Sequence, residues 1–128
     1  MTTYPLEIYR GPLEAIRAGT KKVEIRTLNS YESIPYDKLL PGDRILFQII
    51  AGPPFGGLEV VEADALLVEV RKVLHYPNPG ALLRAEGMEV LSGLCESFEE
   101  GEKLLYSFFE YKEQIPVHGI FALHIRPV

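Results

Sequence analysis

The chain lacks the residues that would staple it covalently or anchor it in a membrane. Cys95 is the only cysteine among 128 residues, so no disulfide can form within the chain, as is typical of proteins from a reducing compartment. No apolar run approaches the roughly 18 residues that a membrane-spanning helix needs, and the first residues do not resemble a secretory leader. We therefore expect a cytoplasmic protein that makes no membrane contact.

Basic residues are also scarce relative to acidic ones. The 13 lysines and arginines face 18 aspartates and glutamates, which gives a formal charge of −5. Proteins that hold duplex DNA cover its phosphates with basic side chains, so this balance argues against duplex DNA as a partner but allows a local cationic pocket. The three histidines lack the spacing of metal ligands, and we expect neither a metal nor another cofactor.

No repeat, low-complexity tract or linker divides the sequence, so we expect one domain over residues 1–128. Period-two alternation and β-branched runs predict five or six strands, the fourth being either one bent strand or two. The predicted strands cover residues 4–9, 22–27, 45–50, 58–76 and 119–127. With a helix near the start and two in the second half, this order predicts an α+β fold, a small and mostly antiparallel β-barrel with about three peripheral helices.

Three capping signals define the predicted helices. Pro12 suits the first position of a helix that Gly19 ends, and Asn78 suits the N-cap of a helix running towards Ala85. Ser97 and the glutamate three residues later have the spacing of a capping box. The helix that starts there is predicted to run through residue 113 and to end before Pro116.

One short segment is hard to explain by folding alone. The stretch AGTKKVEIRT predicts a strand in which Val23 and Ile25 point inward, while Lys22, Glu24 and Arg26 point to the opposite face. The simplest interpretation is that this charged face is the solvated side of the strand. A functional interpretation rests on the position of the stretch directly after a helix-ending glycine, where a helix, a strand and a loop meet at a rim.

The motifs of the chain resemble those of the ASCH family, a branch of the PUA-like superfamily. Gly19, Lys21, Glu24 and Arg26 match its G-x-K-x-x-E-x-R pattern. The sequences GDRILF and HGIFALHI match its G-D-x-I-x-F motif and its last strand. This resemblance implies a β-barrel with a charged cleft that binds RNA or a nucleoside- or nucleotide-like molecule. Lys21, Glu24 and Arg26 would then be ligand-binding residues, with Tyr31 and Tyr36 as stacking platforms in the adjacent loop.

The resemblance also implies a catalytic alternative. One branch of the family resembles an amidohydrolase that removes the acyl group from N4-acetylcytidine, using a lysine at the position of Lys21, a threonine at the position of Glu24 and a later glutamate, here matched to Glu86. In this chain Glu24 or Glu86 would have to activate water while Lys21 stabilises the oxyanion. The same cleft would also serve a ribonuclease, so Lys21, Glu24 and Glu86 are the candidate catalytic residues.

A third interpretation is a protein-interaction domain without a small ligand. It requires the aromatic residues Phe109 and Tyr111, near the end of the last predicted helix, to form an exposed apolar patch. The leading prediction remains a binding protein for RNA or a nucleotide-like ligand.

Overall fold

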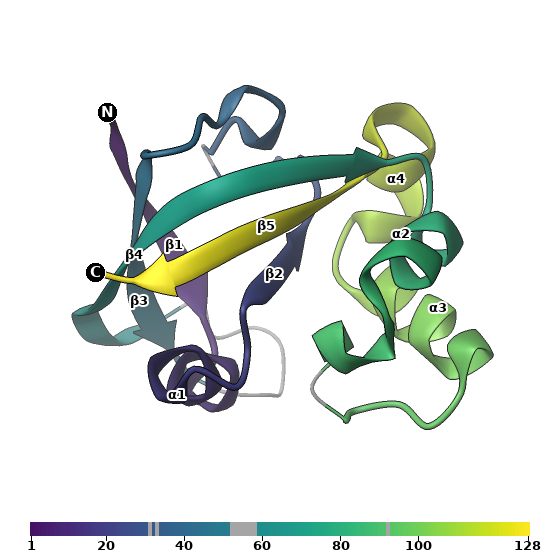
Figure 1. The fold of residues 1–128 in the computed structure, drawn as a ribbon, viewed down its shortest axis with the longest axis horizontal. Helices are drawn as coiled ribbons and strands as arrows, with labels where there is room; N and C mark the ends of the chain where they lie inside the picture. Colours follow the sequence, from purple (N-terminus) through teal and green to yellow (C-terminus); the bar gives the residue numbers. More distant parts are fainter. Residues whose placement is uncertain (31, 33, 52–58, 92) are drawn as a thin grey trace.

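A curled, five-stranded mixed sheet dominates the described part of the chain, which comprises residues 1–30, 32, 34–51, 59–91 and 93–128 of the computed structural model (Figure 1). The strands are β1 (Thr3–Ile8), β2 (Val23–Arg26), β3 (Arg44–Ile50), β4 (Val60–Tyr76) and β5 (Ile120–Pro127). The α-helices are α1 (Arg10–Ala18), α2 (Pro79–Glu86), α3 (Phe98–Ser107) and α4 (Tyr111–His118), and the 3-10 helices are η1 (Tyr36–Lys38) and η2 (Met88–Leu91). The fold is therefore α+β.

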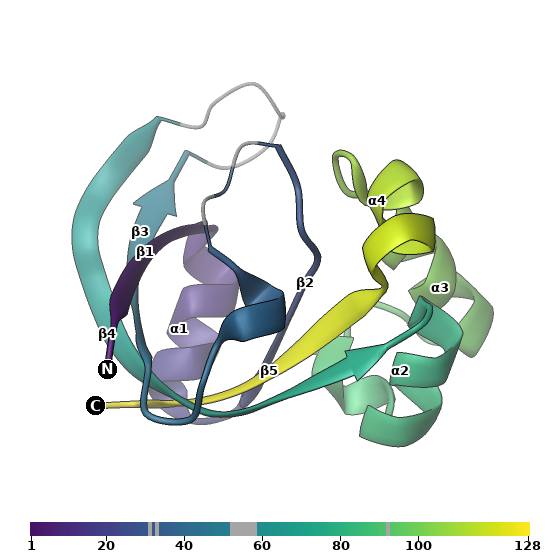
Figure 2. The ribbon, with the colours of Figure 1, turned by 90° about the horizontal axis from the view of Figure 1, so that it is seen from above.

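The sheet does not close into the predicted barrel over the described residues. Its strand order is β1-β3-β4-β5-β2, so β1 and β2 are its two edges. The pairing of β1 with β3 is parallel, and the other pairings are antiparallel. The curl of the sheet brings the edges towards each other (Figure 2), and a side chain bridges them: Nη2 of Arg26 in β2 donates to the carbonyl of Glu7 in β1 at 3.0 Å. A guanidinium group thus satisfies a backbone acceptor at the seam, where a closed barrel would have a ladder bond.

The capping signals mostly act as predicted. Gly19 adopts a left-handed φ of 84° and ends α1, and the side chain of Asn78 accepts from the Ala81 amide at 2.8 Å. Ser97 accepts from the amide three residues later. The start of α1 was wrong by two residues, because the helix begins at Arg10 and Pro12 occupies its third position. The first turn needs no backbone donors there either, so proline is tolerated at this position.

The last predicted helix is two helices in the structure. α3 ends at Ser107, and Glu110 has a left-handed φ of 67°, which turns the chain before α4 begins. Pro116 lies inside α4 and does not end it. The described chain therefore has four α-helices where about three were expected, and none of them is both long and apolar enough to cross a membrane.

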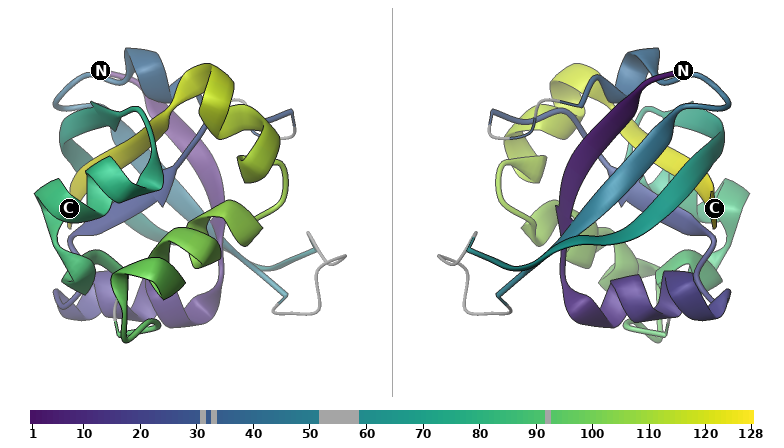
Figure 3. Two further views of the ribbon diagram at one scale, coloured as in Figure 1. Left: turned by 90° about the vertical axis from the view of Figure 1, so that its right-hand side faces the viewer. Right: turned by 90° about the vertical axis from the view of Figure 1, so that its left-hand side faces the viewer.

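Two apolar cores lie on opposite faces of β5. Because side chains alternate along a strand, Phe121 and Leu123 enter a core with α1, β1 and β3, while Ile120 and Ala122 enter a core with α2, α3 and α4. The strands β1, β3 and β4 lie side by side over the first core (Figure 3). The helices α2, α3 and α4 lie beyond the C-terminal end of β4 and the N-terminal end of β5 (Figure 1). The short strand β2 pairs with β5 and so lies between the two cores.

Candidate functional site

The side chains of the strand β2 are buried or half-buried on both of its faces. Val23 points inward, as predicted, and packs in the core that contains α2, α3 and α4. The opposite face is not the solvated side of an amphipathic strand, because Glu24 is only 7% exposed and lies across from Leu123 in the pairing with β5. Lys22 alone among the charged residues of this segment is exposed. The interpretation of this face as a solvated surface is therefore wrong for Glu24.

Glu24 is the centre of a charged network formed by Lys21, Glu24, Arg26, Glu32 and Tyr36. Its two oxygens lie 3.3 Å from Nζ of Lys21 and 2.9 Å from Nη2 of Arg26. Nη1 of Arg26 also reaches Glu32 at 2.9 Å, and the hydroxyl of Tyr36 donates to the other oxygen of Glu32 at 2.5 Å. Two cations and two carboxylates balance within the network, so its charges are directed at one another.

The environment of the charged network keeps Glu24 ionised. Burial by itself raises the pKa of this carboxyl, but the charges of Arg26 and Lys21 and their hydrogen bonds outweigh burial and hold the pKa below its usual value. Burial likewise raises the pKa of Tyr36, so its hydroxyl is a donor at neutral pH. A carboxylate held between two cations is a weak base. Glu24 is thus suited to holding its neighbours in place.

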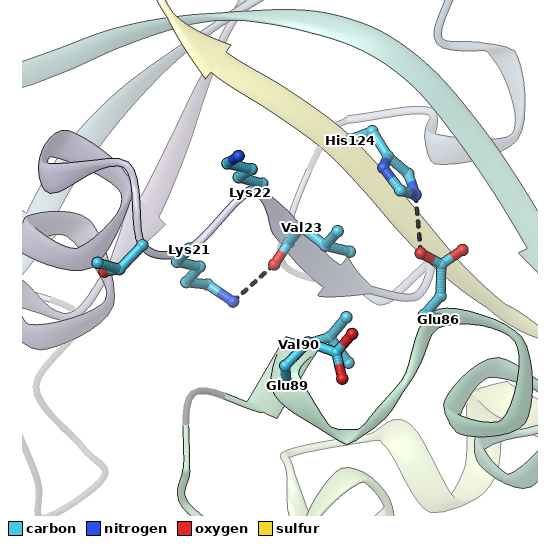
Figure 4. A pocket seen from close by; sticks show the side chains of 8 residues that line it. Lys21, Lys22, Val23, Glu86, Glu89, Val90 and His124 are labelled. Atoms are coloured by element: carbon cyan, nitrogen blue, oxygen red, sulfur yellow. Dashed lines mark hydrogen bonds and ion pairs between the residues drawn. The ribbon is translucent and has the colours of Figure 1, made fainter.

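A pocket of about 280 Å³ opens on the other side of Lys21, between the turn after α1, the end of α2 and the strand β5 (Figure 4). It is lined by Thr20, Lys21, Lys22, Val23, Glu86, Glu89, Val90 and His124. Its volume is just below the usual range for ligand sites, roughly 300 to 1,000 Å³. Among the described residues, no three His, Cys, Asp or Glu side chains lie close enough together to hold a metal ion.

Glu86, the last residue of α2, lines this pocket, and each of its carboxylate oxygens has a polar neighbour. The hydroxyl of Tyr76 donates to Oε2 at 2.5 Å, and Nε2 of His124 lies 2.8 Å from Oε1. The imidazole is off the line of a hydrogen bond, so its buried Nε2 has no hydrogen-bond partner among the described residues. Burial and the bond to Glu86 raise the pKa of Tyr76 to about 12, which keeps this hydroxyl a donor at neutral pH. Glu86 is therefore a fixed acceptor in the pocket wall.

The structure divides the predicted site residues into two groups that share Lys21. Lys21 and Glu86 line the same pocket although 65 positions separate them in sequence (86 − 21). Glu24 and Arg26 contact Lys21 directly or through each other, but they do not line the pocket.

The two tyrosines predicted to stack on bases do not provide that surface in the described structure. Tyr36 is 1% exposed and packs near Phe121, with ring centroids 6.3 Å apart, so its face is not available to a base; this prediction is corrected. Tyr31 lies outside the described residues. The predicted apolar patch is also incomplete, because Phe109 is exposed at 66% whereas Tyr111 is buried at 5%.

Several pocket and network residues escaped the sequence analysis. Glu32 follows Arg26 by six positions in an irregular segment, where no periodicity relates the two side chains. His124 reaches the pocket because it pairs with Val23 across two strands that are about 100 residues apart in sequence (124 − 23 = 101). Tyr76 meets Glu86 because the chain turns sharply at Asn78. Only the strand pairing and that turn reveal these neighbours.

Comparisons with known proteins support the fold but do not indicate a specific function. No protein-family model matches the chain, and no curated protein matches it. The hypothetical protein PH0355 superposes with a TM-score of 0.74 at 26% identity, over 100% of both chains. Protein PF0455 from Pyrococcus furiosus superposes with a TM-score of 0.68 at 26% identity, over 98% of this chain and 97% of that one.

A more distant likeness concerns an ASCH protein. A serine-to-alanine mutant of ZmASCH from Zymomonas mobilis superposes with a TM-score of 0.50 at 15% identity, over 98% of this chain and 72% of that one. At this identity the likeness concerns the fold alone. The chain therefore has a fold similar to the ASCH type, in agreement with the motif resemblance at that coarser level.

Proposed function

We propose that this protein binds a small nucleoside- or mononucleotide-like ligand in the pocket between β2, β5 and the end of α2. The observation that carries the proposal is the convergence of Lys21 and Glu86 on one cavity of about 280 Å³. A cation and a fixed carboxylate are the kind of sparse polar groups that orient a ligand in a pocket. Val23 and Val90 contribute apolar surface between them.

The charge balance of the pocket supports a small ligand over an RNA strand. Lys21 and Lys22 are matched by Glu86 and Glu89, so the lining has no net positive charge before His124 is counted. An RNA strand presents a run of phosphates, which a binding surface meets with a basic groove and exposed aromatic side chains. The pocket therefore fits an RNA strand less well than a small ligand.

The experiment is a titration followed by NMR with a panel of nucleosides and mononucleotides. We expect the amide signals of Lys21, Lys22, Glu86 and Glu89 to shift together, and Lys21→Ala to weaken binding by about 10- to 100-fold, the usual scale for one charge-assisted contact. The matched control is Lys38→Ala, an exposed lysine of η1 outside the pocket, which should bind as the wild type does. Absence of any localised shift at millimolar ligand would refute the proposal.

Acyl-amide hydrolysis of N4-acetylcytidine, or RNA cleavage, is the second candidate, because Lys21 and Glu86 would face the same bound molecule. In that case Glu86 is the better base, since Glu24 is buried, ion-paired and outside the pocket lining. Chromatography for released cytidine and a labelled RNA ladder test the two reactions. A true activity should be lost in Glu86→Gln, and an unaffected rate in that variant would exclude this pocket as its source.

A further inference from the structure

The pocket has two walls of opposite hydrogen-bonding character. The turn after α1 supplies the lysine wall, formed by Thr20, Lys21 and Lys22, and the end of α2 with η2 supplies the glutamate wall, formed by Glu86 and Glu89. Figure 4 shows the two lysines on one side of the cavity and the two glutamates on the other. A ligand that fills the cavity must therefore present different groups at its two ends.

The lysine wall offers a positive charge that is held in place and still has a donor to give. Nζ of Lys21 donates to the carbonyl of Val23 at 2.7 Å and lies 3.3 Å from Oε1 of Glu24, and its side chain is 9% exposed. An ammonium group has three N–H donors, so these two contacts leave one for a ligand. Lys22 adds a second charge at the rim of the pocket, since it is exposed.

The glutamate wall offers carboxylate acceptors, and the ring nitrogen next to it, Nε2 of His124, is buried. The side chain of Glu86 is 7% exposed, and its carboxylate is fixed between Tyr76 and His124. A carboxylate accepts about four hydrogen bonds, so a ligand N–H can still bind to it. The carboxylate of Glu89 lies against Gly87, where a Cβ would come within 2.4 Å of Oε2. A carbonyl or phosphate oxygen placed at this wall would meet the two carboxylates, because Nε2 of His124 is buried beside Glu86.

We propose that the pocket selects a mononucleotide whose base carries an exocyclic amino group, with the phosphate at the lysine wall and the amino group at the glutamate wall. This inference rests on the proposed function and adds the orientation and class of the ligand. A base with a keto oxygen in place of the amino group leaves Glu86 facing another acceptor, and a buried polar group without its partner is costly. The two walls together disfavour ligands with several phosphates, because only one wall attracts an anion.

The first test uses the unmodified protein and pairs of nucleotides that differ in amino against keto groups. Calorimetric titration compares cytidine with uridine monophosphate, and adenosine with inosine monophosphate; we expect the amino member to bind about 10- to 100-fold more tightly in each pair. Cytidine without phosphate should bind more weakly than its monophosphate. Equal affinity within both pairs overturns the inference but leaves the proposed function standing, whereas no binding by any of them overturns both.

The second test exchanges the acceptor for a group that can donate. Glu86→Gln keeps the size of the side chain and adds an amide N–H₂, so the preference for the amino-bearing nucleotides should shrink to about threefold or less, or reverse. Glu69→Gln is the matched control, because Glu69 also contacts a basic side chain, that of Arg126, but lies outside the pocket. An unchanged amino preference in a folded Glu86→Gln protein overturns the inference. If that variant does not fold, the nucleotide pairs on the wild type still decide it.

Discussion

Two clusters of similar composition lie on either side of Lys21, and they differ in how their charges are arranged. The charged network contains two cations and two carboxylates whose ion pairs all measure 3.3 Å or less. The pocket also contains two lysines and two glutamates, but they line opposite sides of an open cavity. Removing one partner of a buried ion pair destabilises a structure because it leaves the other charge unpaired, whereas charges kept apart by a cavity are available to a ligand. The same residue types therefore separate into a supporting cluster and, in our proposal, a ligand-binding one.

Lys21 connects the two clusters. Arg26 holds Glu24, Glu24 holds Lys21, and Lys21 faces the pocket. We therefore infer that the motif residues on β2 position Lys21 through a chain of contacts, and that Lys21 is the one that touches a ligand.

The largest effect on stability should follow from removing the side chain of Arg26 from the charged network. Arg26→Ala leaves Glu24 and Glu32 buried without their main cation and removes the bridge from β2 to Glu7. Breaking a buried pair in this way costs about 3 to 5 kcal/mol. We expect a loss of that size in the free energy of unfolding, measured by urea denaturation.

The control for that change is an ion pair on the surface. Arg126 contacts Glu69 at 2.9 Å, with side-chain exposures of 58% and 29%. Arg126→Ala should cost no more than about 1 kcal/mol, because water screens such pairs. If both variants lose the same stability, the network is not the supporting cluster described above.

A smaller effect should appear in the acid range. The pKa of Glu24 in the folded protein lies below its ordinary value of 4.5, so the unfolded chain binds a proton before the folded one does. The stability that Glu24 contributes is complete above about pH 4.5 and is lost as the pH falls through the lower, folded pKa. One such group adds at most about 1.4 kcal/mol per pH unit to the slope.

Denaturation curves between neutral and acid pH would measure this contribution. Glu24→Gln should lower stability at neutral pH and should also give a flatter dependence on pH below 4.5 than the wild type. Glu14→Gln changes an exposed carboxylate paired with Arg17 and serves as the reference. A slope in Glu24→Gln that matches the wild type would show that Glu24 titrates alike in the folded and unfolded chains.

The sequence predicted those parts of the fold that depend on neighbours along the chain. Gly19, Asn78 and Ser97 act at helix ends as their chemistry requires, and each effect spans only three or four residues. The alternation of β2 also placed Val23 on the apolar side correctly. The break between α3 and α4 was missed because it depends on a left-handed residue that is not glycine, Glu110.

The parts that were missed depend on contacts between distant segments. The edge strands β1 and β2 do not pair, and the side chain of Arg26 on β2 reaches the Glu7 carbonyl on β1 instead. Tyr36 was expected to offer its ring as a stacking platform in the loop beside the cleft, yet its hydroxyl donates to Glu32 and its ring is buried. The placement of Lys21 and Glu86 in one site was suggested by the family resemblance alone. No periodicity relates a residue on a turn to a residue on a helix that is so distant in the sequence.

The smallest expected effect is a change in nucleotide affinity caused by the loss of a helix cap. Asn78 caps α2, which carries Glu86, while Ser97 caps α3, which contributes no residue to the pocket. Loss of either cap costs about 1 kcal/mol, so Asn78→Ala and Ser97→Ala should lower the unfolding free energy by similar amounts. Only Asn78→Ala should also weaken nucleotide binding, by about two- to fivefold, because a frayed α2 holds Glu86 less firmly against Tyr76. Calorimetric titration of both variants measures this, and equal affinities in the two would show that the position of Glu86 does not depend on its helix being capped.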